Sequence, residues 1–233
     1  MNTSNKKSHI SAVCAGLCFM MLAATGLRAE PEGKIVSQWK MSSFNGSEVE
    51  NSVPNAGALT LEDIQAVPVP GEESGVKGLR FENKEALKGK STEIPDLGAF
   101  CDPQRPFAVR MVVVPLERQT GAYAGLFEAG VYMHSGFRMV ITQQLKIGIE
   151  ISSDDQNSGL GGKTTLALGT AYTVEVRFDG KAVTLLVNGE VEAEKETPSL
   201  TPFEGVFRIG RASGQDYDFK GIIGEVSVFA LKP

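Results

Sequence analysis

The alternation of apolar and polar residues over residues 172–191 is the clearest pattern in the chain. Apolar side chains there recur at every second position, which is typical of a β-strand with one buried face. Asp179-Gly180 and Asn188-Gly189 follow one strand length apart, and both dipeptides favour the positive φ angles of tight hairpin turns. The pattern therefore predicts an antiparallel meander of three strands. The apolar positions of its first strand are Tyr172, Val174, Val176 and Phe178.

The same short alternation recurs along most of the chain, and turn-forming residues separate the segments. No helical period is sustained, and no internal repeat or interior linker is visible, so residues 34–233 are predicted to form one all-β domain. We expect an antiparallel two-sheet β-sandwich. Further strands are predicted at residues 34–41, 78–81, 91–94, 107–113, 125–128, 131–133, 137–142, 146–151, 205–209 and 219–229.

Two segments between these strands are predicted to be irregular. Residues 154–162 are polar and rich in glycine, which predicts a loop. Residues 67–71 contain two prolines, which lack the N–H group that the interior of a sheet requires, so this segment is predicted to be a loop or an edge strand. Trp39, the only tryptophan of the chain, is expected in the core.

The first 29 residues have the layout of a secretory signal peptide. A pair of lysines precedes residues 10–24, which are almost entirely apolar or small, and Ala29 closes a small-residue cleavage site. The apolar run is shorter than the ~20 residues that cross a bilayer easily. A lipid anchor on one of its two cysteines is the alternative, but Val13 and Leu17 precede them where Gly, Ala or Ser is expected. We therefore expect a secreted protein, extracellular or periplasmic, with no membrane span after cleavage.

Charge and composition exclude several classes of partner and chemistry. Residues 1–29 carry three basic residues and no acidic one, so the rest of the chain holds 20 basic and 28 acidic residues, a net charge of −8. An acidic domain without basic runs is unsuited to nucleic acid or an anionic membrane surface. Cys101 and His134 are the only residues of their kinds after cleavage. We therefore expect Cys101 to be unpaired and His134 to lie at the surface, without zinc or a catalytic triad.

Four stretches of the predicted strands carry a resemblance to a known family. They are residues 75–81 (GVKGLRF), 105–109 (RPFAV), 185–190 (LLVNGE) and the pair 208–211 and 219–226 (RIGR and FKGIIGEV). In this order and spacing they resemble the laminin-G-like jelly roll of the concanavalin A-like lectin and glucanase superfamily. The resemblance covers residues 34–233. It implies a concanavalin A-like jelly roll that binds carbohydrate or another extracellular ligand.

The chain departs from that family at two positions. Tyr172 stands where the family has a tryptophan, and Gly224 stands where it has an aspartate. In related jelly rolls this aspartate often lies near a structural calcium ion, so its replacement weakens the implied calcium site. Asp154, Asp155 and Asn157 could still supply oxygen ligands, as could the aspartates that flank Tyr217, but neither group has EF-hand spacing. We assign no metal ligand and no cofactor, with calcium as the alternative.

The carboxylates of the chain do not reproduce the motif of the glycosidases in this superfamily. Those enzymes carry Glu-x-Asp-x-x-Glu or Glu-x-Asp-x-Glu on one strand, so that alternate acids enter the cleft. The nearest match is residues 150–154, in which Ser152 replaces the middle aspartate and no second glutamate follows. Glu150 and Asp154 are therefore expected on a solvated strand face and in a turn. We assign no catalytic residue, and a degenerate hydrolase site remains the alternative.

Sugar-binding surfaces need aromatic rings that stack on the sugar and polar groups that bind its hydroxyls. Tyr123, Tyr132 and Tyr217 are predicted in or beside loops, and Arg211 is a nearby polar candidate. We assign these four as ligand-binding residues at a loop-rimmed concave side of the sandwich.

The sequence thus predicts a secreted, non-catalytic module that binds a glycan or another extracellular ligand. An adhesion module that docks an extracellular protein and a glycoside hydrolase of the same fold are the alternatives.

Overall fold

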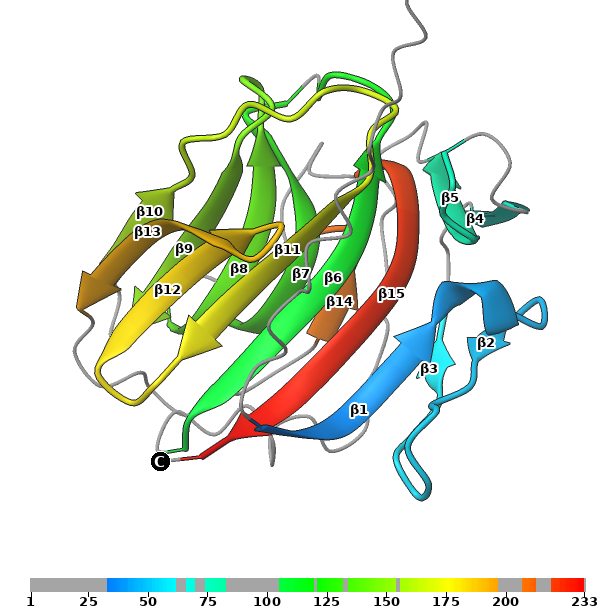
Figure 1. Ribbon diagram of the computed structural model, residues 1–233, viewed down its shortest axis with the longest axis horizontal. Coiled ribbons are helices and arrows are strands. Elements are labelled where there is room, and N and C mark those ends of the chain that lie inside the picture. Colours follow the sequence, from blue (N-terminus) through cyan, green and yellow to red (C-terminus); the bar gives the residue numbers. More distant parts are fainter. Residues whose placement is uncertain are drawn as a thin grey trace, which may run out of the picture.

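A computed structural model describes residues 33–61, 66–69, 74–82, 105–119, 121–131, 134–153, 156–196, 207–212 and 219–232. In these residues the chain forms two antiparallel sheets that pack face to face, together with a two-stranded ribbon and one short 3-10 turn, η1 (Met41–Ser43) (Figure 1). The predicted all-β, two-sheet sandwich is therefore confirmed. No helix in the described part of the chain is long and apolar enough to cross a membrane.

The larger sheet has eight strands in the order β13-β12-β11-β6-β15-β5-β4, and β1 pairs with β15 alongside this path. It lies nearer to the viewer in Figure 1. The first strand of the domain thus pairs with the last one. The strands are β1 (Gly33–Lys40), β4 (Ala66–Val69), β5 (Gly78–Glu82), β6 (Phe107–Pro115), β11 (Tyr172–Phe178), β12 (Ala182–Val187), β13 (Glu190–Glu196) and β15 (Lys220–Leu231).

The smaller sheet has five strands in the order β10-β9-β8-β7-β14 and lies behind the larger one in Figure 1. Its strands are β7 (Tyr123–Val131), β8 (Ser135–Thr142), β9 (Ile147–Ser153), β10 (Gln156–Gly161) and β14 (Phe207–Ile209). The separate ribbon consists of β2 (Glu48–Val49) and β3 (Leu59–Thr60).

The predicted meander is confirmed as β11, β12 and β13. At the turn between β12 and β13, Asn188 has a φ of 52° and Gly189 a φ of 88°, the pair of positive angles that a type I′ turn needs. In the other turn, the side chain of Asp179 accepts hydrogen bonds from the N–H groups of Lys181 and Ala182 at 2.8 Å. Asn188-Gly189 therefore forms the predicted two-residue turn. The other turn spans three residues, 179–181, and in it only Gly180 has a positive φ, of 94°, so the predicted two-residue turn at Asp179-Gly180 is wrong in its length.

Three details differ from the sequence prediction or fall outside the structure. Residues 154–162 were expected to be a loop, but β10 pairs with β9 along its whole length, because glycine and serine are tolerated on an edge strand with one paired side. Residues 125–128 and 131–133 were expected as two strands, whereas β7 is continuous through Gly130, whose φ is 100°. Residues 91–94 lie outside the described residues. The proline-containing β4 lies at the end of the larger sheet, as expected of an edge strand.

The core lies between the two sheets and is rich in phenylalanine. The ring of Phe107 lies 5.7 Å from that of Phe178 on the neighbouring strand and 5.7 Å from that of Phe137 in the opposite sheet. Phe137 in turn lies 5.7 Å from Phe127. Trp39 is fully buried, as predicted, and its indole N–H donates to the carbonyl of Gly57. The inward positions of both sheets therefore share one core, which fixes the side chains that point outward.

Glu192 on β13 attaches the segment after β10 to the edge of the larger sheet. Its carboxylate accepts hydrogen bonds from the backbone N–H groups of Lys163 and Thr164 and from the hydroxyl of Thr164. Burial alone would raise the pKa of this carboxyl group, but the hydrogen bonds from Thr164 and Lys163 outweigh it, so the pKa lies below its ordinary value. The charged form of Glu192 therefore stabilises the fold.

We expect this carboxylate to make stability depend on pH. Because its pKa is lower in the folded state, its contribution is complete above the ordinary value of 4.5 and is lost as the pH falls through the folded-state pKa. The variant Glu192→Gln should unfold at a lower temperature than the wild type near neutral pH, and the difference should shrink below pH 4.5. Exposed Glu190 on the same strand gives the control, since Glu190→Gln should unfold like the wild type. A difference that stays constant in thermal melts across this range would contradict the assignment.

Candidate functional site

The outer face of the five-stranded sheet, turned away from the core, carries an uninterrupted row of charged residues. The register places Arg208 of β14 opposite Glu128 of β7, Glu128 opposite Arg138 of β8, and Arg138 opposite Glu150 of β9. Residues directly opposite in antiparallel strands point to the same face, so these four side chains lie side by side. We call them the charged row. Basic and acidic members alternate along it, and its net charge is zero.

The four residues of the charged row form two ion pairs, each between one arginine and one glutamate. Arg208 Nη1 donates to Glu128 Oε2 at 2.7 Å, and Arg138 Nε donates to Glu150 Oε2. The two inner side chains are the most buried, with exposed fractions of 3% for Glu128 and 4% for Arg138, whereas Glu150 is 29% exposed. A buried charge is costly unless it is paired, so each inner residue depends on its partners. The row is therefore rigid, and its Glu150 end is accessible.

Tyr123 lies beside the charged row and is held by it. Its hydroxyl accepts a hydrogen bond from Arg138 Nη2 at 2.7 Å, and the guanidinium of Arg138 lies 4.9 Å from the centre of the tyrosine ring. Contacts of this kind between a cation and a ring orient both groups. One face of the ring is thus covered by Arg138. Tyr123 is half-buried at the first residue of β7.

Small and uncharged polar residues surround the charged row on the same face. Val140 of β8 lies opposite Gly148 of β9, and Gly148 lies opposite Gly161 of β10, which gives a stretch without large side chains across three strands. Beyond the other side of the charged row, the hydroxyl of Ser152 donates to the side-chain oxygen of Asn157 at 2.8 Å. The face thus combines a ring, hydroxyl, amide and carboxylate groups and a floor without large side chains. Such a surface suits a ligand with many hydroxyl groups.

The structure describes two of the four ligand-binding residues that the sequence predicted, Tyr123 and Arg211. Tyr123 belongs to the face just described. Arg211 is half-buried next to β7, where its backbone and that of Ala212 pack so closely on Gly125 that a side chain there would collide. Tyr132 and Tyr217 lie outside the described residues. Sequence reasoning missed Arg138 and Glu128. Their opposite charges at outward positions of adjacent strands were visible, but their pairing depends on the register.

The carboxylates of this face are arranged differently from a hydrolytic pair. Glu128 and Glu150 stand two strands apart, roughly 10 Å from the strand spacing alone, and Arg138 lies between them. Each accepts a hydrogen bond from an arginine. A retaining glycosidase needs its two carboxyl groups ~5 Å apart, and one of them must be protonated. Asp154, the other acid of the nearest motif, lies outside the described residues.

The described residues show no cluster of three or more His, Cys, Asp or Glu side chains that could hold a metal ion. His134 lies in the exposed turn between β7 and β8, as expected. Cys101 lies outside the described residues.

The chain matches a family model described as the concanavalin A-like lectin/glucanases superfamily, of laminin-G type, over residues 89–232. This protein therefore belongs to that superfamily, as the sequence motifs indicated. A search of curated proteins found no significant match.

Two solved structures of low sequence identity share the fold, and a third matches about half of the chain. Domain 4 of a GH43 extracellular arabinanase from Geobacillus stearothermophilus, solved with arabinotriose, is 20% identical over 87% of this chain and 96% of that chain, with a TM-score of 0.58. A Trypanosoma rangeli sialidase, solved with a difluoro-KDN compound, is 17% identical over 85% of this chain, with a TM-score of 0.62. The match covers 31% of the sialidase chain. The CBM40 module of a Ruminococcus gnavus sialidase, bound to α2,3-sialyllactose, is 19% identical over 55% of this chain and 78% of that chain, with a TM-score of 0.46.

We expect the variant Glu150→Gln to lower the free energy of unfolding by ~1–3 kcal/mol, because it removes a carboxylate that is paired with the nearly buried guanidinium of Arg138. The control is Glu117→Gln. The side chain of Glu117 is 66% exposed and its carboxylate lies 3.7 Å from Lys220 Nζ, so the change in the free energy of unfolding should stay within ~0.5 kcal/mol. Urea denaturation of both variants measures the difference. Equal stability of Glu150→Gln and the wild type would show that the charged row is solvated and loosely held.

Proposed function

We propose that this protein is a secreted, non-catalytic carbohydrate-binding module, and that it binds a neutral glycan on the outer face of the five-stranded sheet. The observation that carries this proposal is the charged row with Tyr123 at its side. Its cations and anions neutralise one another, so the face offers hydrogen-bonding groups and a ring without an excess of charge. This is the chemistry that recognises sugar hydroxyls together with the apolar face of a sugar ring.

The fold comparisons support a saccharide ligand. The arabinanase domain that this chain covers almost from end to end is itself a separate module, and it was solved with arabinotriose. A jelly roll of this size can therefore serve as a binding module attached to, or acting beside, a catalytic protein. The identity of 20% does not transfer the arabinan specificity, so the ligand of this protein has to be found with a panel of glycans.

The carboxylate geometry supports binding without hydrolysis. An inverting glycosidase also needs one carboxyl group as the acid and a second one facing a water across the sugar. Here Arg138 occupies the space between Glu128 and Glu150, and both carboxylates are committed to guanidinium groups. For Glu128 or Glu150 to act as a general acid, its ion pair with an arginine would first have to break so that the carboxylate could be protonated.

We further propose that residues 1–29 direct export and are removed, which rests on the layout of the sequence. The mass of protein recovered from outside the producing cell should then correspond to a chain that begins near Glu30. Exported protein that retains the first 29 residues, or full-length protein that stays in the membrane fraction, would overturn this part of the proposal.

The binding proposal can be tested by calorimetry against neutral polysaccharides, including arabinan, xylan, mannan and β-glucans. The variant Tyr123→Ala should weaken binding of the ligand found by ~1–3 kcal/mol, because it removes the stacking ring. Tyr123→Phe keeps the ring and should retain most of the affinity. Leu168→Ala, which removes an exposed apolar side chain elsewhere, should bind like the wild type.

Three outcomes would contradict this proposal. Absence of binding across the neutral panel, together with capture of a defined extracellular protein, would favour the adhesion module. Equal affinity of the wild type and Tyr123→Ala would place the ligand elsewhere on the molecule. Release of reducing sugar that disappears in Glu150→Gln, while the variant remains folded, would show a glycoside hydrolase.

A further inference from the structure

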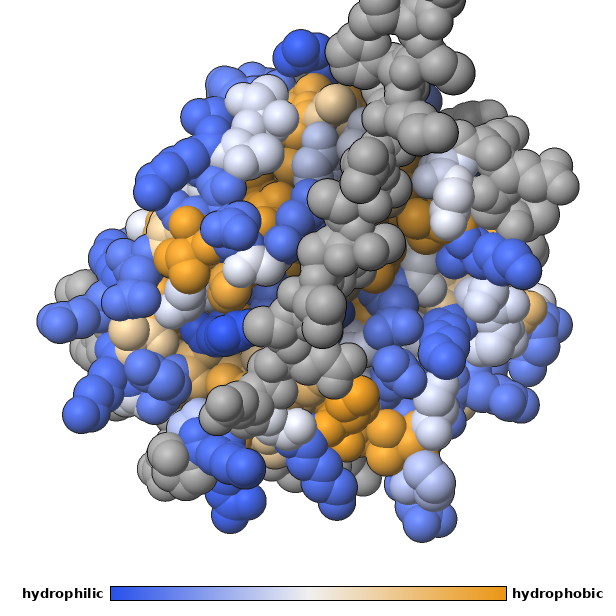
Figure 2. All heavy atoms as spheres, in the orientation of Figure 1, coloured by the Kyte–Doolittle hydropathy of each residue, from blue (hydrophilic) through white to orange (hydrophobic). Residues whose placement is uncertain are grey.

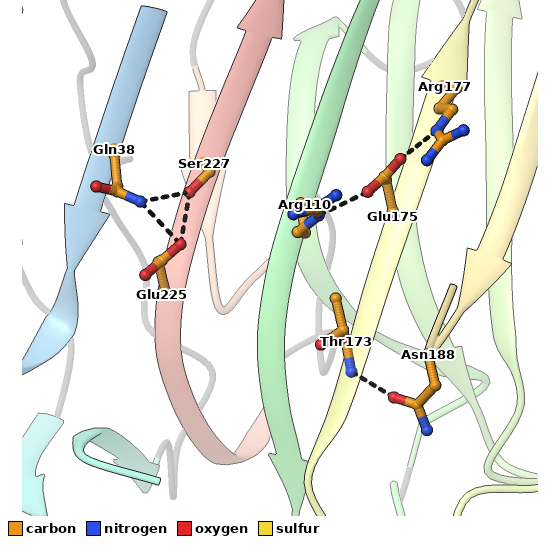
Figure 3. Close-up of polar contacts among 8 residues, drawn as sticks. All are labelled: Gln38, Arg110, Thr173, Glu175, Arg177, Asn188, Glu225 and Ser227. Carbon is orange, nitrogen blue, oxygen red and sulfur yellow. Dashed lines mark hydrogen bonds and ion pairs between the residues drawn. The ribbon is translucent and has the colours of Figure 1, made fainter. Parts of the chain in front are cut away.

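The outer face of the eight-stranded sheet carries a second polar cluster, which differs from the charged row in one respect. Figure 2 views the molecule from this side and shows hydrophilic and hydrophobic side chains mixed over its described part. The cluster, drawn in Figure 3, has most of its members on the central strands β6 and β11. We call it the donor patch, and it comprises Arg110 of β6, Thr173, Glu175 and Arg177 of β11, and Asn188 of the turn after β12.

The two arginines of the donor patch share a single carboxylate. Arg110 Nε donates to Glu175 Oε2 at 2.6 Å, and Arg177 Nε donates to Glu175 Oε1 (Figure 3). Each arginine thus uses the inner nitrogen of its guanidinium. In the described part of the chain the terminal nitrogens of these two arginines make no hydrogen bond. The three side chains therefore carry one uncompensated positive charge and four unused donor groups.

The surroundings strengthen this charge. The side chain of Glu175 is 5% exposed and that of Arg110 is 15% exposed, so water screens them poorly. The guanidinium of Arg110 also lies 5.0 Å from the ring centre of Phe229, which fixes its position. Arg177 is 33% exposed and opens the patch to solvent. An anion that approaches from the Arg177 side would meet a fixed excess of positive charge.

Thr173 supplies a second and independent observation. It is 4% exposed, and its hydroxyl oxygen has no hydrogen-bond partner in the structure. A buried hydroxyl without a partner costs free energy, and such groups are uncommon in folded proteins. The backbone N–H of Thr173 donates to Asn188 Oδ1 at 2.9 Å, so the amide nitrogen of Asn188 is left facing outward as a further donor. Thr173 lies on the same face as Glu175 and Arg177, because the three residues alternate along β11.

The neighbouring polar groups on β1 and β15 are already satisfied. Glu225 accepts hydrogen bonds from Gln38 Nε2 at 3.0 Å and from the hydroxyl of Ser227 at 2.7 Å (Figure 3). Lys40 lies directly opposite Glu225 in the register, so this pair adds no net charge. Unused donors are thus concentrated on the β6–β11 side, which distinguishes the donor patch from its neighbours.

We propose that the donor patch is a binding site for the carboxylate of an acidic sugar, as in a polysaccharide of uronic acids. The terminal nitrogens of Arg110 and Arg177 would bind the carboxylate, because a guanidinium matches its two oxygens. The hydroxyl of Thr173 and the amide of Asn188 would bind ring hydroxyls. An acidic peptide strand fits less well, since β6 and β11 are hydrogen-bonded to other strands on both sides and offer no free edge for strand addition.

This site is independent of the neutral-glycan site proposed above, because it lies on the other sheet and shares none of its residues. Calorimetry at low ionic strength with oligogalacturonate and oligoalginate tests it directly. Arg110→Gln and Arg177→Gln should each weaken binding by about tenfold or more, and added salt should weaken binding to the wild type. Lys181→Gln removes the same charge from an exposed turn of the same sheet and should change affinity less than about twofold.

Two further comparisons separate a binding role from a structural one. Thr173→Val keeps the shape of the side chain and removes the unpaired hydroxyl, so it should weaken binding severalfold while the melting temperature stays equal or rises. Methyl-esterified oligogalacturonate keeps the sugar but loses the charge, and it should bind about tenfold more weakly or not at all. Tyr123→Ala should leave binding of the acidic oligomers unchanged.

The proposal would be overturned by failure of the wild type to bind either acidic oligomer, or by equal binding of the acid and the ester. It would also be overturned if Arg110→Gln and Arg177→Gln remained folded and bound like Lys181→Gln. Neither result would affect the neutral-glycan site, which is tested with other ligands and with Tyr123.

Discussion

The packing of phenylalanine rings across the gap between the sheets is the interaction on which the rest of the structure depends. Phe107 of the larger sheet contacts Phe137 of the smaller one, and Phe178 and Phe127 extend the same cluster on either side. Because side chains alternate along a strand, fixing these residues inward fixes their neighbours outward. Arg138 follows Phe137, and Glu128 follows Phe127. The position of the charged row is therefore a consequence of the aromatic core.

The two outer faces use the same residue types with different results. On the smaller sheet, two arginines meet two glutamates, and every pair is complete. On the larger sheet, two arginines meet one glutamate, and a buried threonine hydroxyl is left without a partner. Where positive and negative charges are equal in number and poorly screened by water, the ion pairs hold a fixed geometry. Where positive charges are in excess, the cluster still attracts an anion. The number of carboxylates therefore distinguishes the proposed neutral-glycan site from the proposed site for an acidic sugar.

Much of the fold can be predicted from local sequence patterns, namely turn dipeptides and the alternation of apolar and polar residues. Asn188-Gly189 adopts the positive φ angles that its composition favours, and Trp39 is buried as its strand pattern indicated. The faces were harder to predict, because their chemistry depends on register. The pairing of β7 with β8 shifts between Gly125 and Phe127, and a slip of one residue reverses the face of every side chain beyond it. For this reason Tyr123 could be proposed from its type, but its contact with Arg138 could not. The strand β10 was missed because its glycines resemble a loop until the backbone of β9 pairs with them.

The placement of the two candidate sites on opposite sheets has a consequence for how the protein would bind a polysaccharide. The two sheets of a sandwich lie ~10 Å apart with the core between them, so a single sugar residue cannot contact both faces. Binding at one face therefore changes the other only through the core, whose close packing resists small displacements. Two ligands would bind nearly independently, and substitutions on the two faces should act additively. A material that contains both neutral and acidic polysaccharides could in contrast bind to both faces of one protein molecule. Once one face is bound, the high local concentration of polysaccharide would favour binding at the second face. Weak affinity at each face is thus compatible with firm retention on a mixed polysaccharide.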